Sequence, residues 1–206
     1  RQMCIRDRTK RALITGITGQ DGAYLSKFLI KKGYKVFGAL RRTSSINTSR
    51  LSYLGVLNDI ELVPMDLAEI TNIQRLIERI EPDEIYNLAA QSFVQTSYEQ
   101  PIYTSDIDGI GVTRLLETVR NLGGRPKFYQ ASTSEMFGKA EQSPQNENTP
   151  FYPRSPYGIA KLYSHWMTVN YREAWNVFAC SGILFNHESP LRGTEFVTRK
   201  ISQGMA

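Results

Sequence analysis

A tyrosine and a lysine, Tyr157 and Lys161, stand four residues apart in a stretch whose composition predicts a helix. Residues at this spacing share one helix face, so the phenol and the ammonium are expected side by side. A free tyrosine has a pKa of about 10 and is a poor base at neutral pH. A nearby ammonium favours the phenolate and lowers that pKa, which makes the pair a candidate proton acceptor. The spacing alone is common in proteins, so its weight depends on what precedes it.

A hydroxyl and a carboxylate, Thr133 and Glu135, follow a predicted strand at residues 127–132. The carboxyl ends of strands in an open α/β sheet are where ligands bind. Glu135 is therefore a candidate general acid/base. Taken alone, a glutamate after a strand is more often a surface carboxylate or a helix cap, and the Tyr157/Lys161 pair downstream is what favours the catalytic interpretation.

Three glycines, Gly16, Gly19 and Gly22, are separated from one another by two residues each. They lie between an apolar run that predicts a strand and a stretch whose apolar residues recur at helical spacing. The first allows a tight turn, the second lets a pyrophosphate approach the backbone, and the third lets helix and strand pack closely. Amide groups at the start of the helix then face the anion. Any tight strand-to-helix turn can use glycine, but the order of strand, turn and helix favours a dinucleotide-binding loop.

Strands and helices alternate along the chain, which predicts a parallel sheet covered on both faces. We expect an α/β fold with a doubly wound parallel sheet of Rossmann type, right-handed crossovers and strand order 3-2-1-4-5-6. The expected strands are 11–15, 35–40, 60–64, 84–88, 127–132 and 177–185, and the expected helices are 22–32, 49–57, 70–80, 102–122 and 157–175.

Three other strand ends carry binding candidates. Arg41 and Arg42 stand where enzymes that use NAD place an acidic residue, and two arginines suit a 2′-phosphate, so the sequence predicts NADP; the alternative is a pair of solvated loop arginines. Asp66 is either an acceptor for the adenine amino group, with Leu67 under the ring, or the N-cap of the next helix. The small side chains of residues 88–90 either let a cofactor pass close to the backbone or serve only the packing of the core.

Composition excludes several classes of protein. The 206 residues are 41% apolar, which excludes a disordered chain, and no apolar run approaches the roughly 20 residues of a membrane span. The net charge is +5, but no dense Lys/Arg stripe indicates nucleic acid. Two distant cysteines and two histidines give no metal-ligand spacing, and a cytoplasmic location is expected.

The sequence resembles the extended short-chain dehydrogenase/reductase family in the order and approximate spacing of four features: the glycine loop, residues 88–90, Ser132-Thr133 and Tyr157/Lys161. The runs 149–157 and 185–190 are more specific and resemble, within it, the GDP-mannose 4,6-dehydratases. The resemblance covers residues 10–201. Two positions depart from it: Phe93 stands where many members have His, and Leu191 where many have a second arginine.

The resemblance implies a dehydratase of GDP-mannose that uses NADP, with Thr133, Glu135 and Tyr157 catalytic and Lys161 supporting both Tyr157 and the cofactor. Ser92, Asn186 and Glu188 are expected to contact the substrate. Another nucleotide-sugar dehydratase, epimerase or reductase, or a non-catalytic NADP-binding module, stays an alternative. The implied cofactor residues are Gly16, Thr18, Gly19, Gln20, Asp21, Gly22, Arg41, Asp66, Leu67, Leu88, Ala89, Ala90, Gln91, Ser92, Tyr103, Lys161, His187 and Arg192.

The expected domain organisation has three parts. Residues 1–9 are expected to be a disordered or foreign tail, residues 10–186 the NADP-binding domain, and residues 187–206 the incomplete start of a substrate-binding domain. On this view the chain is a fragment, with a helix beginning at residues 196–201. The long polar loop 41–50 resembles loops that reach a neighbour's cofactor, so a homo-oligomer is expected.

Overall fold

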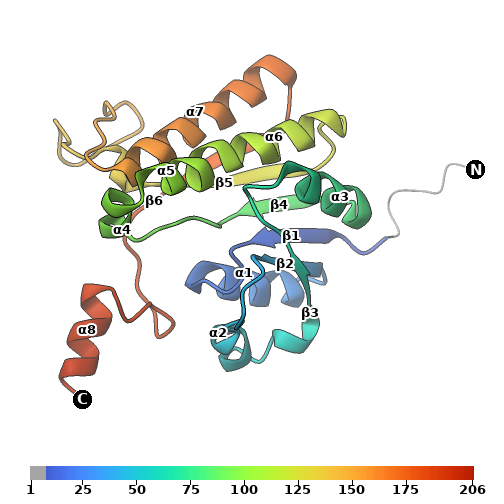
Figure 1. The fold of residues 1–206 in the computed structure, drawn as a ribbon, viewed down its shortest axis with the longest axis horizontal. Coiled ribbons are helices and arrows are strands. Elements are labelled where there is room, and N and C mark those ends of the chain that lie inside the picture. The colour runs from blue at the N-terminus through green and yellow to red at the C-terminus, as the bar shows by residue number, and fades with distance from the viewer. Residues whose placement is uncertain (1–7) are drawn as a thin grey trace, which may run out of the picture.

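Six parallel strands form one sheet in the computed structural model, which describes residues 8–206 (Figure 1). The strand order β3-β2-β1-β4-β5-β6 confirms the predicted order. The first seven residues of the predicted tail lie outside the described part. The strands are β1 (Arg11–Thr15), β2 (Lys35–Leu40), β3 (Ile60–Pro64), β4 (Glu84–Asn87), β5 (Lys127–Thr133) and β6 (Ala179–Leu184).

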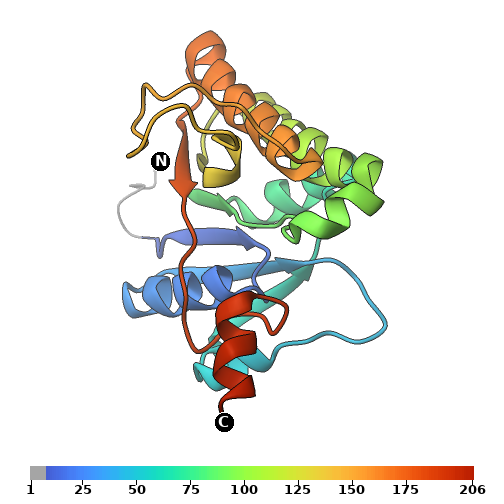
Figure 2. The ribbon, with the colours of Figure 1, turned by 90° about the vertical axis from the view of Figure 1, so that its left-hand side faces the viewer.

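Helices cover both faces of the sheet, as Figure 2 shows, because side chains alternate along each strand. In β1, Leu13 points into the core under α3, α6 and α7, whereas Ala12 and Ile14 point into the core under α1 and α2. The helices are α1 (Gln20–Lys31), α2 (Ser49–Tyr53), α3 (Ile70–Ile80), α4 (Val94–Glu99), α5 (Pro101–Ser105), α6 (Gly111–Asn121), α7 (Pro156–Trp175) and α8 (Val197–Gly204).

The long helix predicted at 102–122 is interrupted. Helix α5 passes into a π-helical turn (Asp106–Ile110), and α6 follows directly. Helix α4 was not predicted, because its sequence Val-Gln-Thr-Ser-Tyr-Glu shows no apolar period. The π-helical turn shifts which side chains face the core, and it buries the carboxylate of Asp108.

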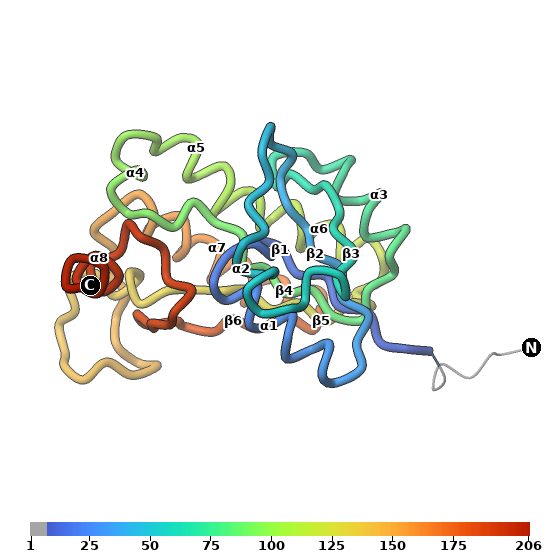
Figure 3. The backbone as a smooth tube through the Cα atoms, turned by 90° about the horizontal axis from the view of Figure 1, so that it is seen from below, coloured from blue at the N-terminus to red at the C-terminus, as the bar shows by residue number. Residues whose placement is uncertain are grey.

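After β6 the chain crosses the carboxyl end of the sheet and ends in α8, as predicted for residues 196–201. Figures 1 and 3 place α8 at the opposite end of the molecule from the start of β1. In the part of the chain that the structure describes, none of the helices has the length and apolar character to span a membrane.

Candidate active site

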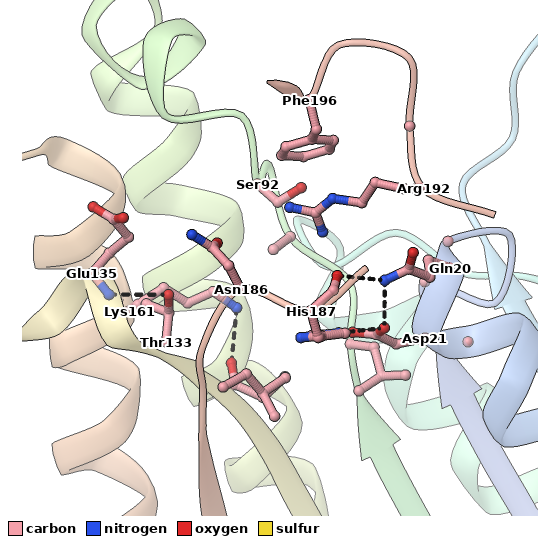
Figure 4. A pocket seen from close by; sticks show the side chains of 18 of the residues that line it. Gln20, Asp21, Ser92, Thr133, Glu135, Lys161, Asn186, His187, Arg192 and Phe196 are labelled. Carbon is pink, nitrogen blue, oxygen red and sulfur yellow. Dashed lines mark hydrogen bonds and ion pairs between the residues drawn. The ribbon is translucent and has the colours of Figure 1, made fainter. Parts of the chain in front are cut away.

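Two adjoining cavities lie at the carboxyl ends of the strands. One, of about 370 Å³, is bounded by the ends of β5 and β6 and the start of α7 (Figure 4). The other, of about 560 Å³, is bounded by the ends of β2 and β3 and by residues 41–47. Both are lined by Gly16, Gly19, Leu88, Ala90 and Ser92, so they form one elongated site across the middle of the sheet.

The glycine loop between β1 and α1 fits a phosphate ligand. Gly16 has φ +68°, and a Cβ there would lie 2.8 Å from the backbone nitrogen of Ala89. A Cβ on Gly22 would lie 2.6 Å from the carbonyl oxygen of Gly16, so both positions need glycine for backbone packing. A Cβ on Gly19 would meet only that same oxygen, at 3.2 Å, which leaves open space in front of the N-terminus of α1.

A buried side-chain network fixes the strand ends behind this loop. The Thr15 hydroxyl donates to Asn87 at 2.6 Å, and the Asn87 amide donates to Gln130 at 2.7 Å. Thr15 Oγ1 also accepts the amide hydrogens of Leu88 and Ala89, at 3.1 Å each. These hydrogen bonds therefore hold in place the backbone after β4, which lines both cavities.

The catalytic candidates lie around the first cavity. Helix α7 starts at Pro156, where the Ser155 side chain accepts the amide hydrogen of Gly158 at 3.0 Å and so fixes the turn that carries Tyr157. Lys161 Nζ donates to the carbonyl oxygen of Ala131 at 3.0 Å and lies 5.8 Å from the centre of the Tyr157 ring.

Thr133 and Glu135 face the same cavity from the end of β5. The Thr133 hydroxyl accepts the amide hydrogen of Glu135 at 3.2 Å, which caps the short turn that carries this carboxylate. Figure 4 shows Thr133, Glu135 and Lys161 on one wall, with His187 and Arg192 on the opposite wall.

The expected lowering of the Tyr157 pKa by Lys161 is wrong for this structure. Burial raises the pKa of Tyr157 to about 12; the Thr133 hydroxyl opposes this, and the charges of Asp108 and Glu135 add to it. Burial also lowers the pKa of Lys161. Desolvation is the largest cause for both groups because Tyr157 and Lys161 are only 8% and 3% exposed.

The second cavity contains the candidates for the far end of a dinucleotide. Arg41 donates to the hydroxyl of Tyr103 at 2.6 Å, and both line the cavity, whereas Arg42 does not. Asp66 also lines it and accepts the amide hydrogen of Ala68 at 3.0 Å. The N-cap of α3 is Glu69, so the helix-cap alternative for Asp66 is wrong.

A segment that we call the closing segment, residues 185–196, covers the glycine loop. His187 Nε2 lies 2.7 Å from an oxygen of Asp21, and Gln20 donates to the His187 carbonyl at 3.2 Å. The Ser189 hydroxyl donates to the Gln20 side chain at 2.7 Å. The hydrogen bond with the carbonyl of Phe185, and then the one with Asp21, raise the pKa of His187.

Arg50 also holds the closing segment, a role that no pattern in the sequence predicts. Its guanidinium donates to the Leu191 carbonyl at 2.8 Å and to the Thr18 carbonyl at 3.1 Å. The Leu191 side chain is buried in the core under α1 and α2. Leu191, one of the two positions that depart from the family pattern, therefore fills the core. Phe93, the second such position, packs edge-on against Phe196 at a ring-centroid distance of 6.4 Å.

Arg192 lines the first cavity with its guanidinium carbon 3.7 Å from the centre of the Phe196 ring. Its Nε lies 3.3 Å from a carboxylate oxygen of Glu188, which also accepts the Thr198 hydroxyl at 2.5 Å. Glu188, a predicted substrate residue, lines neither cavity; its carboxylate pairs with Arg192, which lines the first.

The structure brings the remaining candidates together. The first cavity is lined by the predicted residues Gly16, Gly19, Gln20, Asp21, Gly22, Leu88, Ala90, Ser92, Thr133, Glu135, Tyr157, Lys161, Asn186, His187 and Arg192. The second cavity adds Thr18, Arg41, Asp66, Leu67, Ala89, Gln91 and Tyr103. Within residues 8–206, no group of three or more His, Cys, Asp or Glu side chains is arranged to hold a metal ion.

Comparison with known proteins gives a consistent result. The sequence model of a family described as GDP-mannose 4,6 dehydratase matches residues 13–206. A GDP-mannose 4,6-dehydratase of Yersinia enterocolitica is 56% identical over 205 residues, covering 96% of this chain and 55% of that protein. The human GDP-mannose 4,6 dehydratase is 55% identical over 203 residues, covering 95% and 55%. The chain thus spans about half the length of the curated relatives it matches.

Solved structures share the fold. A UDP-glucuronic acid 4-epimerase from Bacillus cereus, in complex with UDP-glucuronic acid and NAD, superposes with a TM-score of 0.82 at 22% identity, over 95% of this chain and 62% of that one. A dTDP-glucose 4,6-dehydratase from Bacillus anthracis, in complex with NAD, gives 0.80 at 20% identity, over 96% and 61%.

Proposed function

The chain belongs to the GDP-mannose 4,6-dehydratase family, and from this premise we propose that the full-length protein removes water from GDP-mannose to give GDP-4-dehydro-6-deoxy-mannose. One observation carries the proposal: Thr133, Glu135, Tyr157 and Lys161 surround one cavity, which continues into a second cavity past a glycine loop. The first is a place for a sugar and the second for the far end of a dinucleotide.

The proposed cofactor is NADP, and when bound it supplies a hydride acceptor and donor. The glycine loop and the start of α1 would hold its pyrophosphate, because the space in front of Gly19 is open. Arg41 would bind the 2′-phosphate, and Asp66 and Leu67 would bind the adenine, since all three line the second cavity. Lys161, His187 and Arg192 would hold the other end in the first cavity.

The side chains then have distinct tasks. Tyr157 takes the proton of the C4 hydroxyl, and the Thr133 hydroxyl helps because it favours the phenolate. A ketone at C4 acidifies the proton on C5, which Glu135 removes. Glu135 then gives a proton to the oxygen leaving C6 as water. The C5–C6 double bond that this leaves takes up the hydride that left C4, at C6, and a proton, at C5, which gives the 6-deoxy sugar. Each such proton transfer is worth about 10²–10⁴-fold in rate.

The domain division and assembly are part of the same proposal. Residues 10–186 would form the cofactor-binding domain, and residues 187–206 would begin the substrate-binding part, with Ser92 and Asn186 contacting the sugar nucleotide. Residues 41–50 support a homo-oligomer, because this loop is long, polar and largely exposed.

The test is Glu135→Gln in the full-length protein, with GDP-mannose as substrate and mass spectrometry to follow loss of water. We expect dehydration to fall by about 10²–10⁴-fold, while absorbance of the reduced cofactor still reports oxidation at C4. Glu141→Gln is the matched control, because Glu141 is exposed in the loop before α7. Undiminished dehydration by Glu135→Gln refutes the assignment. A wild-type protein that acts on UDP-glucose or dTDP-glucose but not on GDP-mannose, or on none of them, refutes the proposed substrate.

A further inference from the structure

Arg50 is the second residue of α2, and its guanidinium joins two main-chain carbonyls that are distant in the sequence. Its Nε donates to the Leu191 carbonyl of the closing segment at 2.8 Å. Its Nη1 donates to the Thr18 carbonyl of the glycine loop at 3.1 Å. One side chain of α2 therefore connects the closing segment to the loop between β1 and α1.

The three segments that meet at Arg50 also share apolar packing. Ile17 of the glycine loop, Leu51 of α2 and Leu191 of the closing segment are 0%, 0% and 7% exposed and belong to one buried cluster. Apolar packing is non-directional, so it keeps the segments together without fixing how they are aligned. The two hydrogen bonds of Arg50 supply the direction, because each has a defined acceptor.

This contact depends on a guanidinium. The group holds its N–H donors in a rigid planar fork, so Nε and Nη1 donate to two separate acceptors at once. Within residues 8–206 Arg50 takes part in no ion pair, so no carboxylate competes with the two carbonyls for its donors. Hydrogen bonds with a charged donor are stronger than neutral ones, so their loss has a measurable effect.

The Arg50 side chain also lines the first cavity, together with Gly19 and the start of α1. The closing segment contributes Asn186, His187 and Arg192 to the same cavity, and Figure 4 shows His187 beside the start of α1. A ligand whose phosphates face Gly19 therefore lies between the glycine loop and the closing segment. Such a ligand leaves more easily when the closing segment moves away from the loop.

We propose that Arg50 is a positioning residue that holds the closing segment against the glycine loop and thereby slows the release of a dinucleotide. The other contacts with α1 hold only the first part of the segment, through His187 and Ser189. Arg50 holds the part that follows, at Leu191. The release of a dinucleotide rests on the proposed function, in which NADP binds along the glycine loop, whereas the contact between the two segments does not.

Arg50→Met tests the contact, because methionine keeps much of the apolar stem and removes every donor. The matched control is Arg42→Met in the loop before α2, since Arg42 is exposed and lines neither cavity. The readout is hydrogen–deuterium exchange of the main-chain amides in full-length protein without ligand, which reports local opening of the segment.

We expect exchange in residues 185–196 to be faster by about 10-fold or more in Arg50→Met, because two hydrogen bonds from a charged donor are lost. Exchange in α7 should stay unchanged, and Arg42→Met should match wild type throughout. Wild-type exchange in residues 185–196 of Arg50→Met overturns the proposal. Equally faster exchange in α7 also overturns it, because that result indicates a loss of overall stability.

If Arg50→Met does not fold, Arg50→Gln decides. The amide nitrogen of glutamine occupies the place of Nε in the side chain, so the hydrogen bond to the Leu191 carbonyl is retained, whereas the one to the Thr18 carbonyl is lost. Exchange in residues 185–196 should still be faster than in wild type, because the connection to the glycine loop is broken. Wild-type exchange in this variant overturns the proposal.

The second readout is the rate at which NADP and NAD leave full-length protein, measured by stopped-flow displacement. Arg50→Met should speed the release of both nucleotides by a similar factor of about 10 or more, because both carry the pyrophosphate, and Arg42→Met should change neither rate. Unfolded molecules bind no nucleotide, so a loss of stability alone does not change this rate. Faster amide exchange with unchanged release overturns the proposed effect on the dinucleotide. If the wild type binds neither nucleotide, the proposed function fails, and amide exchange still tests Arg50.

Discussion

Replacing Gly16 by alanine tests the idea that the glycine loop is fixed by backbone contact. Gly16 has φ +68°, and a Cβ would lie 2.8 Å from Ala89 N, 2.9 Å from Ala89 Cα and 2.9 Å from Leu88 C. All three are main-chain atoms, which cannot rotate away as a side-chain tip can. The end of β4, held by the Thr15 hydroxyl, must therefore move.

Gly33 supplies a control that separates two costs. It has φ +80°, but a Cβ there would meet nothing within 4 Å. Gly33→Ala therefore carries only left-handed backbone strain, about 1–2 kcal/mol. Gly16→Ala carries that strain and overpacking of typically about 1–3 kcal/mol, which gives a total of about 2–5 kcal/mol.

The assay is urea unfolding of both variants, followed by tryptophan fluorescence, with the free energy of unfolding compared to wild type. We expect Gly16→Ala to be the less stable by at least about 1 kcal/mol. A Gly16→Ala variant as stable as Gly33→Ala would refute the reasoning, because it would mean that the strand end gives way without cost.

Two further predictions concern charge. Arg41→Ala should weaken NADP binding by about 10–100-fold, as expected for a lost hydrogen bond to a charged group, and should weaken NAD binding much less. Arg42→Ala should change the binding of neither nucleotide. Isothermal titration calorimetry measures both affinities, and equal losses of NADP and NAD binding in Arg41→Ala would contradict the 2′-phosphate role. Hydrogen bonds from Arg120 and then from Tyr171 lower the pKa of Glu117 from 4.5 to about 2, so Glu117 stabilises the fold above its unfolded pKa, and this contribution is lost as the pH falls toward 2. The stability difference between wild type and Glu117→Gln should accordingly be full at neutral pH and shrink below about pH 4.5, and urea midpoints that differ equally at neutral pH and at pH 3 would contradict it.

The sheet was predictable because its strands are short apolar runs bounded by glycine and polar residues. The positions of β1, β2, β3 and α3 agree with the predicted ranges, and the strand order follows from the repeated strand–helix units. Helix α4 was missed because six polar and mixed residues carry no period. The π-helical turn was missed because an extra residue in a helix depends on what packs against it.

The candidate site was predictable where spacing within one element decides it, as for Tyr157 and Lys161, which both line the first cavity. The direction of the Tyr157 pKa was not, because desolvation depends on tertiary burial. Arg50 gave no signal for the same reason: its partner Leu191 is distant in the sequence. The cap alternative for Asp66 was wrong because the N-cap of α3 is Glu69, which only the backbone geometry reveals.

The two hydrogen bonds of Arg50 join parts of the chain that are made at different times. Arg50 and Leu191 lie 141 residues apart, so at about 5–20 residues per second roughly 7–30 seconds of synthesis separate them. β1 and β2 precede Arg50 and β3 follows it closely, whereas the closing segment, which forms one wall of the site, is made at the end of that interval. A ligand stabilises a folded state only when its binding site exists. The proposed cofactor would therefore stabilise the chain only late in its synthesis, once the closing segment has been made.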